Sequence, residues 1–264
     1  MTDAGRRQAL EVIATEVRAC TDCRLHETRT RAVPGEGDPE TEVVVVGEGP
    51  GEHEDRQGRP FVGASGQFLT ELIETIGWRR DDVFITNVVK CRPPGNRDPL
   101  PDEIKACSAH LRHQLEVLDP AVVVTVGKFS LTSFRPGERI SQAHGTTAPA
   151  DPATGARDAL VFAMYHPAFA LYQSSNRQTL LNDVGLVPAA LIEARRRRES
   201  TATIAAANVK TRIHEQVTSA LPTDAAPPLA AGSLPTDAAP PPAAGSPMSP
   251  ADDDALSQLT LFQP

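Results

Sequence analysis

The stretch "EVVVVGEGPGEHEDRQGRPFVG", residues 42–63, decides the fold. Its four valines, followed by glycine and proline, predict a buried strand that ends abruptly in a loop. Glycine-rich loops in this position commonly bind phosphate through backbone N–H groups, often with a lysine. This loop has no lysine and carries Glu48, Glu52, Glu54 and Asp55 instead. It is therefore suited to a ligand that approaches the backbone closely but is not a phosphate.

Strands and helices alternate along residues 1–200. Strands are predicted at 42–47, 83–88, 121–126 and 159–165, and helices at 5–19, 64–77, 101–118, 128–134 and 179–198. Such alternation predicts a parallel sheet with helices on both faces. We therefore expect one three-layer α/β/α domain over residues 1–200, built on a mainly parallel four-stranded sheet.

Polar segments follow every predicted strand. They are "GEGPGEHED", "TNVVKCRPPGNRDP", "VGKFS" and "YHPAF", in chain order. Open parallel sheets bind ligands just beyond the carboxyl ends of their strands. The sequence therefore predicts one site at this edge of the sheet.

The composition changes near residue 218. Two near-identical 13-residue segments, "LPTDAAPPLAAGS" and "LPTDAAPPPAAGS", occupy 221–233 and 234–246. A Pro/Ala repeat buries too little apolar surface to offset chain entropy. We therefore expect residues 201–264 to form a disordered tail.

The net charge of −8 is unevenly distributed. Residues 215–264 contain six acidic residues and no lysine or arginine, which leaves a charge of −2 for the rest of the chain. An acidic total therefore does not exclude a nucleic-acid partner, although any positive face must be local. No stretch approaches the roughly 18 consecutive apolar residues of a membrane span, and no signal peptide opens the chain. These features predict a cytoplasmic protein with no membrane partner.

The four cysteines form two pairs. Cys20 and Cys23 make a C-x-x-C motif, which offers half of a tetrahedral metal or cluster site. Cys91 and Cys107 are separated by fifteen residues, which is wide for a second zinc knuckle and fits a [4Fe–4S] cluster better. A four-cysteine zinc site and simple buried thiols remain alternatives, whereas the compartment disfavours disulfides.

Several separated motifs together resemble the family 4 uracil-DNA glycosylases. They are "GEGPGEHEDRQGRPFVGASGQFL", "ITNVVKCRPPGNRDP", "YHPAF" and the four cysteines at this spacing. The resemblance covers about residues 8–195 and does not reach the repeat tail. It implies the uracil-DNA glycosylase fold, a [4Fe–4S] cluster held by the four cysteines, and excision of uracil from DNA in base excision repair.

The resemblance also implies the chemistry of the acidic loop. A glycosylase flips the uracil nucleotide into a pocket, and positive charge develops on the sugar as the N-glycosidic bond lengthens. Glu48 is expected to position water and stabilise that sugar. Glu54 is expected to act as a second carboxylate that orients the loop or the water. His166, in the "HP" motif, is expected to donate to uracil O2 as the base leaves. Glu52 and Asp55 are predicted to be ordinary surface charges.

Further positions are implied to bind uracil. Phe61 corresponds to the aromatic residue that stacks on the base, and Asn87 to the amide that recognises its edge. An amide can donate to uracil O4 and accept from N3–H, a pattern that cytosine mismatches. Asn96 also matches a family position. The backbone that approaches the flipped nucleotide is expected to comprise Gly47, Gly49, Pro50 and Gly51.

Other residues are predicted to contact DNA. In the "PPGNRDP" loop, Arg97 is a candidate phosphate ligand, as is Arg92 just before it. Phe169 or Leu171 is a candidate apolar wedge for the gap left by the flipped base.

One departure separates this chain from a related group of uracil-binding proteins. That group carries a basic inserted loop whose histidine remains covalently attached to the sugar. Here the loop after Cys91 is short and holds no histidine. Hydrolysis with turnover is therefore expected, with no nucleotide cofactor. The alternatives are a binder that captures uracil-DNA without turnover, or a non-catalytic iron–sulfur scaffold.

The chain ends in "QLTLF" at 258–262, which resembles the peptide by which bacterial repair proteins bind the sliding clamp. A glutamine and apolar side chains on a tether can fill an apolar pocket. The predicted anchors are Gln258, Leu259, Leu261 and Phe262. We expect a monomer that associates with the nucleoid through uracil-containing DNA, single- or double-stranded, and with the clamp through this peptide.

Overall fold

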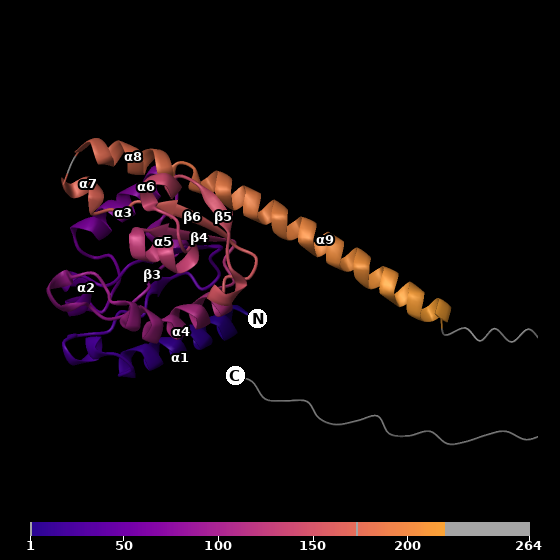
Figure 1. Ribbon diagram of the computed structural model, residues 1–264, viewed down its shortest axis with the longest axis horizontal. Coiled ribbons are helices and arrows are strands. Elements are labelled where there is room, and N and C mark those ends of the chain that lie inside the picture. Colours follow the sequence, from indigo (N-terminus) through magenta and orange to yellow (C-terminus); the bar gives the residue numbers. More distant parts are fainter. Residues whose placement is uncertain (1, 173, 220–264) are drawn as a thin grey trace, which may run out of the picture. The chain divides into compact units, whose positions relative to one another are not determined.

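A computed structural model describes residues 2–172 and 174–219 (Figure 1). Its sheet has six strands in the order β1-β3-β2-β4-β6-β5. The four central strands pair in parallel and confirm the predicted sheet; they are β2 (Val43–Gly47), β3 (Phe84–Asn87), β4 (Val122–Val126) and β6 (Leu160–Met164). Two edge strands that we did not predict, β1 (Glu36–Gly37) and β5 (Thr147–Pro149), pair antiparallel to β3 and β6.

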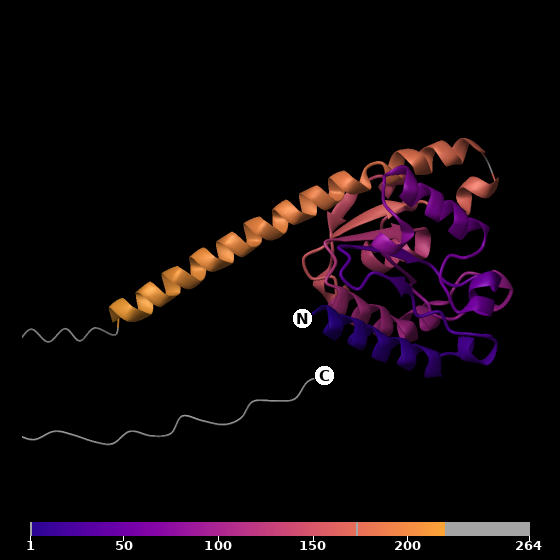
Figure 2. The same ribbon diagram turned by 180° about the vertical axis from the view of Figure 1, so that it is seen from behind.

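Helices cover both faces of this sheet, as expected. One face carries α1 (Asp3–Ala19) and α4 (Pro101–Leu118), and the other carries α3 (Ala64–Thr75), α8 (Ser174–Val184) and the first turns of α9 (Val187–Ser219). Figures 1 and 2 show these two layers from opposite sides. Successive strand side chains alternate between the faces: Val44 and Val46 pack in the α1/α4 core, whereas Val43 and Val45 pack in the α3/α8 core.

Short helices occupy the connections. They are α2 (Glu52–Gln57), α5 (Lys128–Phe134), α6 (Ile140–Ala143) and α7 (Phe169–Tyr172), with 3-10 turns at Arg24–Glu27, Arg80–Asp82, Pro94–Asn96 and Pro152–Thr154. The α2 helix lies inside the acidic loop, where no helix was predicted. The Glu54 carboxylate accepts from the N–H of Gly51 before its first turn, and Gly58 ends it in the left-handed conformation.

The single helix predicted at 179–198 is wrong, because the chain breaks between α8 and α9. Gly185 follows α8, and Pro188 is the second residue of α9, where its missing N–H costs nothing. The α9 helix continues to Ser219, beyond the domain boundary expected at residue 200. Its start is tied to the domain by Arg195, which pairs with Glu42, and by Arg198, which donates to the Pro120 carbonyl at 2.6 Å.

Among residues 2–172 and 174–219, no helix is both long and apolar enough to cross a membrane. The tandem repeat and the four predicted clamp-peptide residues lie outside the described residues.

Candidate active site

A cavity of about 290 Å³ opens at the carboxyl edge of the central strands. All the predicted catalytic and uracil-binding residues except Gly47 line it, together with Arg97: Glu48, Gly49, Pro50, Gly51, Glu54, Phe61, Asn87, Asn96, Arg97 and His166. The ends of three strands, β2, β3 and β6, therefore converge on one pocket, as the sheet-edge rule predicts. Sequence reasoning missed Ser65 and Asp98, which also line it. Asp98 lies in the "PPGNRDP" segment, but a single carboxylate in a loop does not by itself indicate a site.

Phe61 is held in an unusual backbone conformation. Its φ is 51°, its side chain is buried, and its ring stacks on the His166 ring at 5.7 Å between centroids. A left-handed aromatic residue is a strained one that surrounding structure must impose. Two glycines allow it: a Cβ on Gly66 would lie 2.0 Å from the Phe61 carbonyl, and one on Gly47 would lie 2.5 Å from its ring.

Arg80 secures the same backbone from the other side. Its guanidinium donates to the carbonyl of Pro60 at 2.6 Å and to that of Phe61 at 3.2 Å. Glu36 holds Arg80 at 2.9 Å and is itself bound by Arg59 through two hydrogen bonds. These contacts lower the pKa of Glu36 in spite of its partial burial, so the carboxylate stays ionised. Sequence reasoning missed this support, because nothing in a surface-like "WRRDD" segment marks it.

Asn87, at the end of β3, has an unsatisfied polar atom. Its side chain is 1% exposed, and its Oδ1 has no hydrogen-bond partner within the described part of the chain. A buried amide oxygen without a partner costs about 1–3 kcal/mol, so native structures seldom contain one without a reason. The pocket therefore holds an acceptor that a ligand N–H can satisfy.

His166, just after β6, has a defined tautomer. Its Nδ1 accepts a 3.2 Å hydrogen bond from the backbone N–H of Ala168, so the proton of the neutral ring lies on Nε2. Burial lowers the pKa of His166 to about 4, with the nearby Glu54 charge opposing that shift. The imidazole is therefore neutral at pH 7, with one N–H left to donate.

Glu48 follows β2 and is fixed by the start of α5. Its Oε1 accepts from the backbone N–H of Phe129 at 2.9 Å. A Cβ on Gly127 would lie 2.4 Å from the same oxygen, so only glycine permits this approach. Burial raises the pKa of Glu48, and the charge of Asp98 adds to the increase. The carboxylate is consequently a stronger base than a solvated glutamate.

Glu54 and Asp55 both hold backbone rather than facing solvent. Glu54 accepts from the N–H groups of Val62 at 2.8 Å and Gly63 at 2.9 Å, which joins α2 to the Phe61 segment. The prediction that Asp55 is a surface charge is wrong: it is 3% exposed and accepts from the Thr30 N–H at 2.9 Å. Two successive residues of α2 thus anchor two different loops.

The predicted phosphate ligands already have partners in the structure. Arg97 forms two hydrogen bonds, at 2.9 and 2.6 Å, with the fully buried carboxylate of Glu103. Arg92 donates from Nε to Oδ1 of Asn96 at 2.7 Å. Both guanidiniums therefore stiffen the loop at 93–99, and their contact with DNA remains a prediction.

Two predicted wedge residues lie on an exposed turn beyond His166. Phe169 is 38% exposed and Leu171 is 53% exposed, and the Phe169 ring stacks on Tyr165 at 4.5 Å. Neither lines the cavity. Their exposure is compatible with the predicted insertion into DNA.

The four cysteines gather at a second place. They line one small cavity between the end of α1, the segment after β3 and α4. Two donors point at the sulfurs: the Arg29 guanidinium lies 3.1 Å from the Cys91 Sγ, and the Lys90 N–H lies 3.3 Å from the Cys107 Sγ. Four convergent sulfurs with such donors fit a bound metal or cluster.

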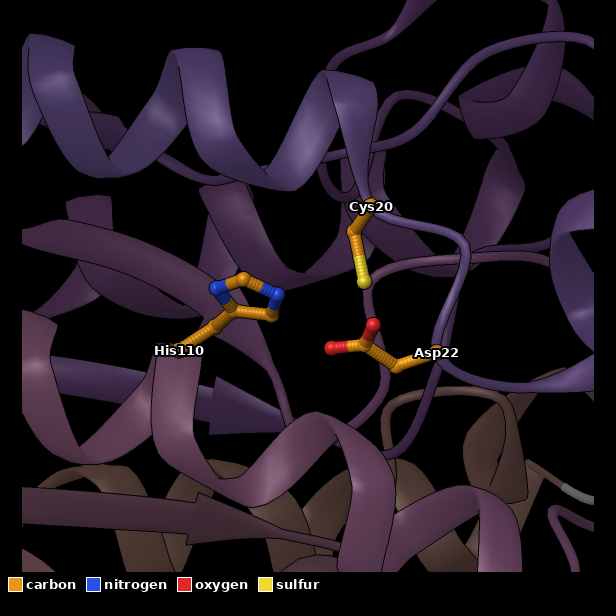
Figure 3. Close-up of side chains that lie close together, drawn as sticks. All are labelled: Cys20, Asp22 and His110. Atoms are coloured by element: carbon orange, nitrogen blue, oxygen red, sulfur yellow. The ribbon is translucent and has the colours of Figure 1, made fainter.

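Burial raises the pKa of the Cys107 thiol to about 12 and also raises that of the Cys91 thiol. At the rim, Cys20, Asp22 and His110 bring one ligand atom each to within 4.8 Å of one another, and Figure 3 shows them pointing together. Asp22 thus offers an oxygen ligand and His110 a nitrogen ligand, neither of which sequence spacing indicated.

The fold and the pocket define an α/β protein with a ligand site at its strand ends. The chain belongs to the uracil DNA glycosylase superfamily, whose family model matches residues 34–185. It is 48% identical over 179 residues to the type-4 uracil-DNA glycosylase of Sulfurisphaera tokodaii, covering 66% of this chain and 81% of that protein. It is 44% identical over 181 residues to the type-4 uracil-DNA glycosylase of Thermotoga maritima, covering 68% and 93%. A type-5 uracil-DNA glycosylase of Thermus thermophilus is 39% identical over 119 residues, 39% of this chain and 54% of that one. The resemblance to the family 4 enzymes is confirmed.

Proposed function

We propose that this protein hydrolyses the N-glycosidic bond of uracil in DNA, releasing free uracil and leaving an abasic site. The unpartnered Oδ1 of Asn87 carries this proposal. In a pocket with Phe61 as one wall, that oxygen can accept from uracil N3–H while the amide nitrogen donates to O4. Cytosine offers no ring N–H at the same place, so it would leave the oxygen unsatisfied.

The leaving base needs a hydrogen-bond donor. As the bond between N1 and C1′ breaks, its electron pair passes to uracil, and negative charge spreads to O2 and O4. The neutral His166 can donate its Nε2–H to O2, because Nδ1 is already occupied by Ala168. A preorganised donor of this kind stabilises developing charge without reorganisation.

The sugar needs a negative group and a water molecule. Glu48, fixed by the Phe129 N–H, offers one carboxylate oxygen toward the pocket. Its charge stabilises the oxocarbenium-like sugar, and its raised pKa suits it to take the proton of the attacking water. Water oxygen adds to C1′, and uracil acquires a proton as it leaves. Glu54 supports the site indirectly. Its oxygens accept hydrogen bonds from the backbone N–H groups of Gly51, Val62 and Gly63, which fixes the segments on either side of α2.

We further propose that Cys20, Cys23, Cys91 and Cys107 hold a [4Fe–4S] cluster. Their wide spacing in sequence and their convergence on one cavity support a cluster over a compact zinc knuckle. Such a group would supply structural cross-linking between the N-terminal segment and the loop after β3. The chemistry at the sugar requires none of its electrons.

The contacts with DNA complete the proposal. Phe169 or Leu171 fills the gap left by the flipped base, and Asn96, Arg92 and Arg97 shape the loop beside the pocket. Exposure of both apolar side chains on one turn supports the wedge.

The test is incubation with uracil-containing duplex and single-stranded oligonucleotides, followed by alkali. Many strand breaks per enzyme molecule are expected, with none on the matched cytosine oligonucleotide. A single stoichiometric burst would instead indicate capture without turnover. A brown protein that releases no uracil would favour the scaffold alternative.

We also propose that Gln258, Leu259, Leu261 and Phe262 bind the replication sliding clamp. The sequence motif and the composition of residues 221–246 support this proposal. Deletion of 256–264 should abolish clamp pull-down and leave excision on short duplexes unchanged. Undiminished pull-down would contradict it.

A further inference from the structure

Lys90 is a fully buried lysine that lies between the end of β3 and α4. Its side chain is 1% exposed, and its ammonium donates to three neutral oxygens: Thr86 Oγ1 at 2.6 Å, the Asn87 carbonyl at 2.8 Å and Gln114 Oε1 at 2.6 Å. All three ammonium protons are therefore used, which fixes the position of the nitrogen. Three convergent acceptors from β3 and α4 therefore hold the side-chain nitrogen of Lys90 at one place.

The side chain of Lys90 folds back to the carbonyl of Asn87, three residues earlier. Lys90 lies three residues after Asn87, and the intervening N–H groups of Val88 and Val89 donate to the carbonyls of Gly47 at 2.9 Å and Glu48 at 3.1 Å. The backbone of Asn87 is thus held from both sides at the end of β3. The side-chain amide of Asn87, which faces the pocket, is therefore held in place by the fixed backbone.

The other end of the network is anchored on α4 and the cysteine cavity. Gln114 and Cys107 are seven residues apart on α4 and therefore lie on one face of that helix. Lys90 contacts both of them, through its ammonium and through its backbone N–H at 3.3 Å. Gln114 is itself fixed by donating to the Pro34 carbonyl at 2.7 Å.

We propose that Lys90 is a positioning residue for uracil recognition, which sets the amide of Asn87 by fastening the end of β3 to α4 beside Cys107. This inference rests on the proposed function. It predicts that losing the ammonium harms base binding while the cysteine site remains loaded.

The test is Lys90→Met in the holoenzyme, which retains length and apolar packing but removes the donors. Iron content per chain and the absorption near 400 nm should equal those of the wild type. The dissociation constant for free uracil, measured by calorimetry, should rise about tenfold, as loss of a charge-assisted hydrogen bond implies. KM for a uracil duplex should rise by about the same factor, with kcat within about twofold.

A matched control is Arg135→Met, which also removes a buried cation. Arg135 is 9% exposed and forms hydrogen bonds with Glu138 and Thr146. It lines neither the active-site cavity nor the cysteine cavity. It should lower the melting temperature and leave uracil affinity unchanged. If Lys90→Met does not fold, Lys90→Gln, which retains two uncharged N–H donors in place of three, should give an intermediate rise in the dissociation constant.

Uracil affinity equal to the wild type in folded, iron-loaded Lys90→Met or Lys90→Gln would overturn the inference. So would a loss of kcat at unchanged KM, since that result indicates only a smaller folded fraction. Wild-type protein that neither binds nor releases uracil would instead overturn the proposed function.

Discussion

The backbone N–H of Ala168 donates to Nδ1 of His166 at 3.2 Å, and this contact decides which nitrogen of the ring carries the proton. With Nδ1 occupied as an acceptor, the pocket receives a neutral N–H donor from Nε2. A proline at 167 shapes the turn that brings the two residues together. The "HP" pair therefore controls protonation as well as position.

The low pKa of His166 predicts how stability depends on pH. Its folded pKa of about 4 lies below the unfolded value of about 6.5, so the unfolded chain binds more protons between those values. Stability should therefore fall as pH is lowered through this window, by about 2 kcal/mol at pH 5. Urea unfolding of the wild type and His166→Phe at pH 7 and pH 5 measures it. An equal pH slope in both proteins would contradict the assignment.

Replacing Glu48 should separate activity from stability. Glu48→Gln retains an acceptor for the Phe129 N–H but removes the charge, so kcat should fall by about 10³. Because burial raises the pKa of Glu48, its ionised form destabilises the fold at pH 7, and the variant should unfold at an equal or higher urea concentration. Glu74→Gln, exposed on α3, is the control and should change neither quantity. A marked loss of stability in Glu48→Gln would show that the carboxylate is structural.

Gly47 should tolerate no side chain. In Gly47→Ala, the new Cβ would lie 2.3 Å from Asn87 Oδ1 and 2.5 Å from the Phe61 ring, so both groups must move. We expect kcat/KM on uracil duplex to fall at least about 100-fold, because displacement of about 1 Å has such an effect. Gly185→Ala, whose Cβ meets nothing closer than 3.4 Å, should retain wild-type activity. Similar activity in the two variants would refute the tight packing behind the pocket.

Arg80 should influence base stacking without touching the base. Arg80→Met removes the donors to the Pro60 and Phe61 carbonyls, so the strained backbone of Phe61 can relax. KM should rise about five- to tenfold, with a smaller change in kcat. Arg79→Met, which breaks only an exposed pair with Asp82, provides the comparison. Steady-state kinetics on one duplex substrate compares the two variants. Equal KM values for Arg80→Met and Arg79→Met would show that Arg80 does not support the backbone of Phe61.

Strong local patterns made much of this fold predictable. Runs of valine predicted the strands β2 and β4. The helix predicted over "PDEIKACSAHLRHQLEVL" has the same first and last residues as α4. The sheet-edge rule then brought Glu48, Asn87 and His166 together without any long-range information. Gly185 and Pro188 also marked the break between α8 and α9, a local signal that was present and overlooked.

The features that escaped prediction depend on tertiary contacts. The edge strands β1 and β5 are two and three residues long and have no apolar run, so only their partners define them. Asp55 resembles any loop acid until the N–H groups of Thr30 and Arg31 are placed beside it. Lys90, inside "NVVKC", is polar by type and becomes buried only because α4 supplies Gln114.

The two tasks of the pocket lie on separate strand ends. Asn87, which we propose to contact the base, ends β3, whereas Glu48 and His166, which we propose to act on the bond, follow β2 and β6. A change of the side chain at position 87 can thus alter which nucleobase is accepted while the groups proposed to break the bond stay on the other strand ends. This arrangement gives descendants of such a chain an evolutionary route to other damaged bases, because selectivity and reactivity can diverge one segment at a time.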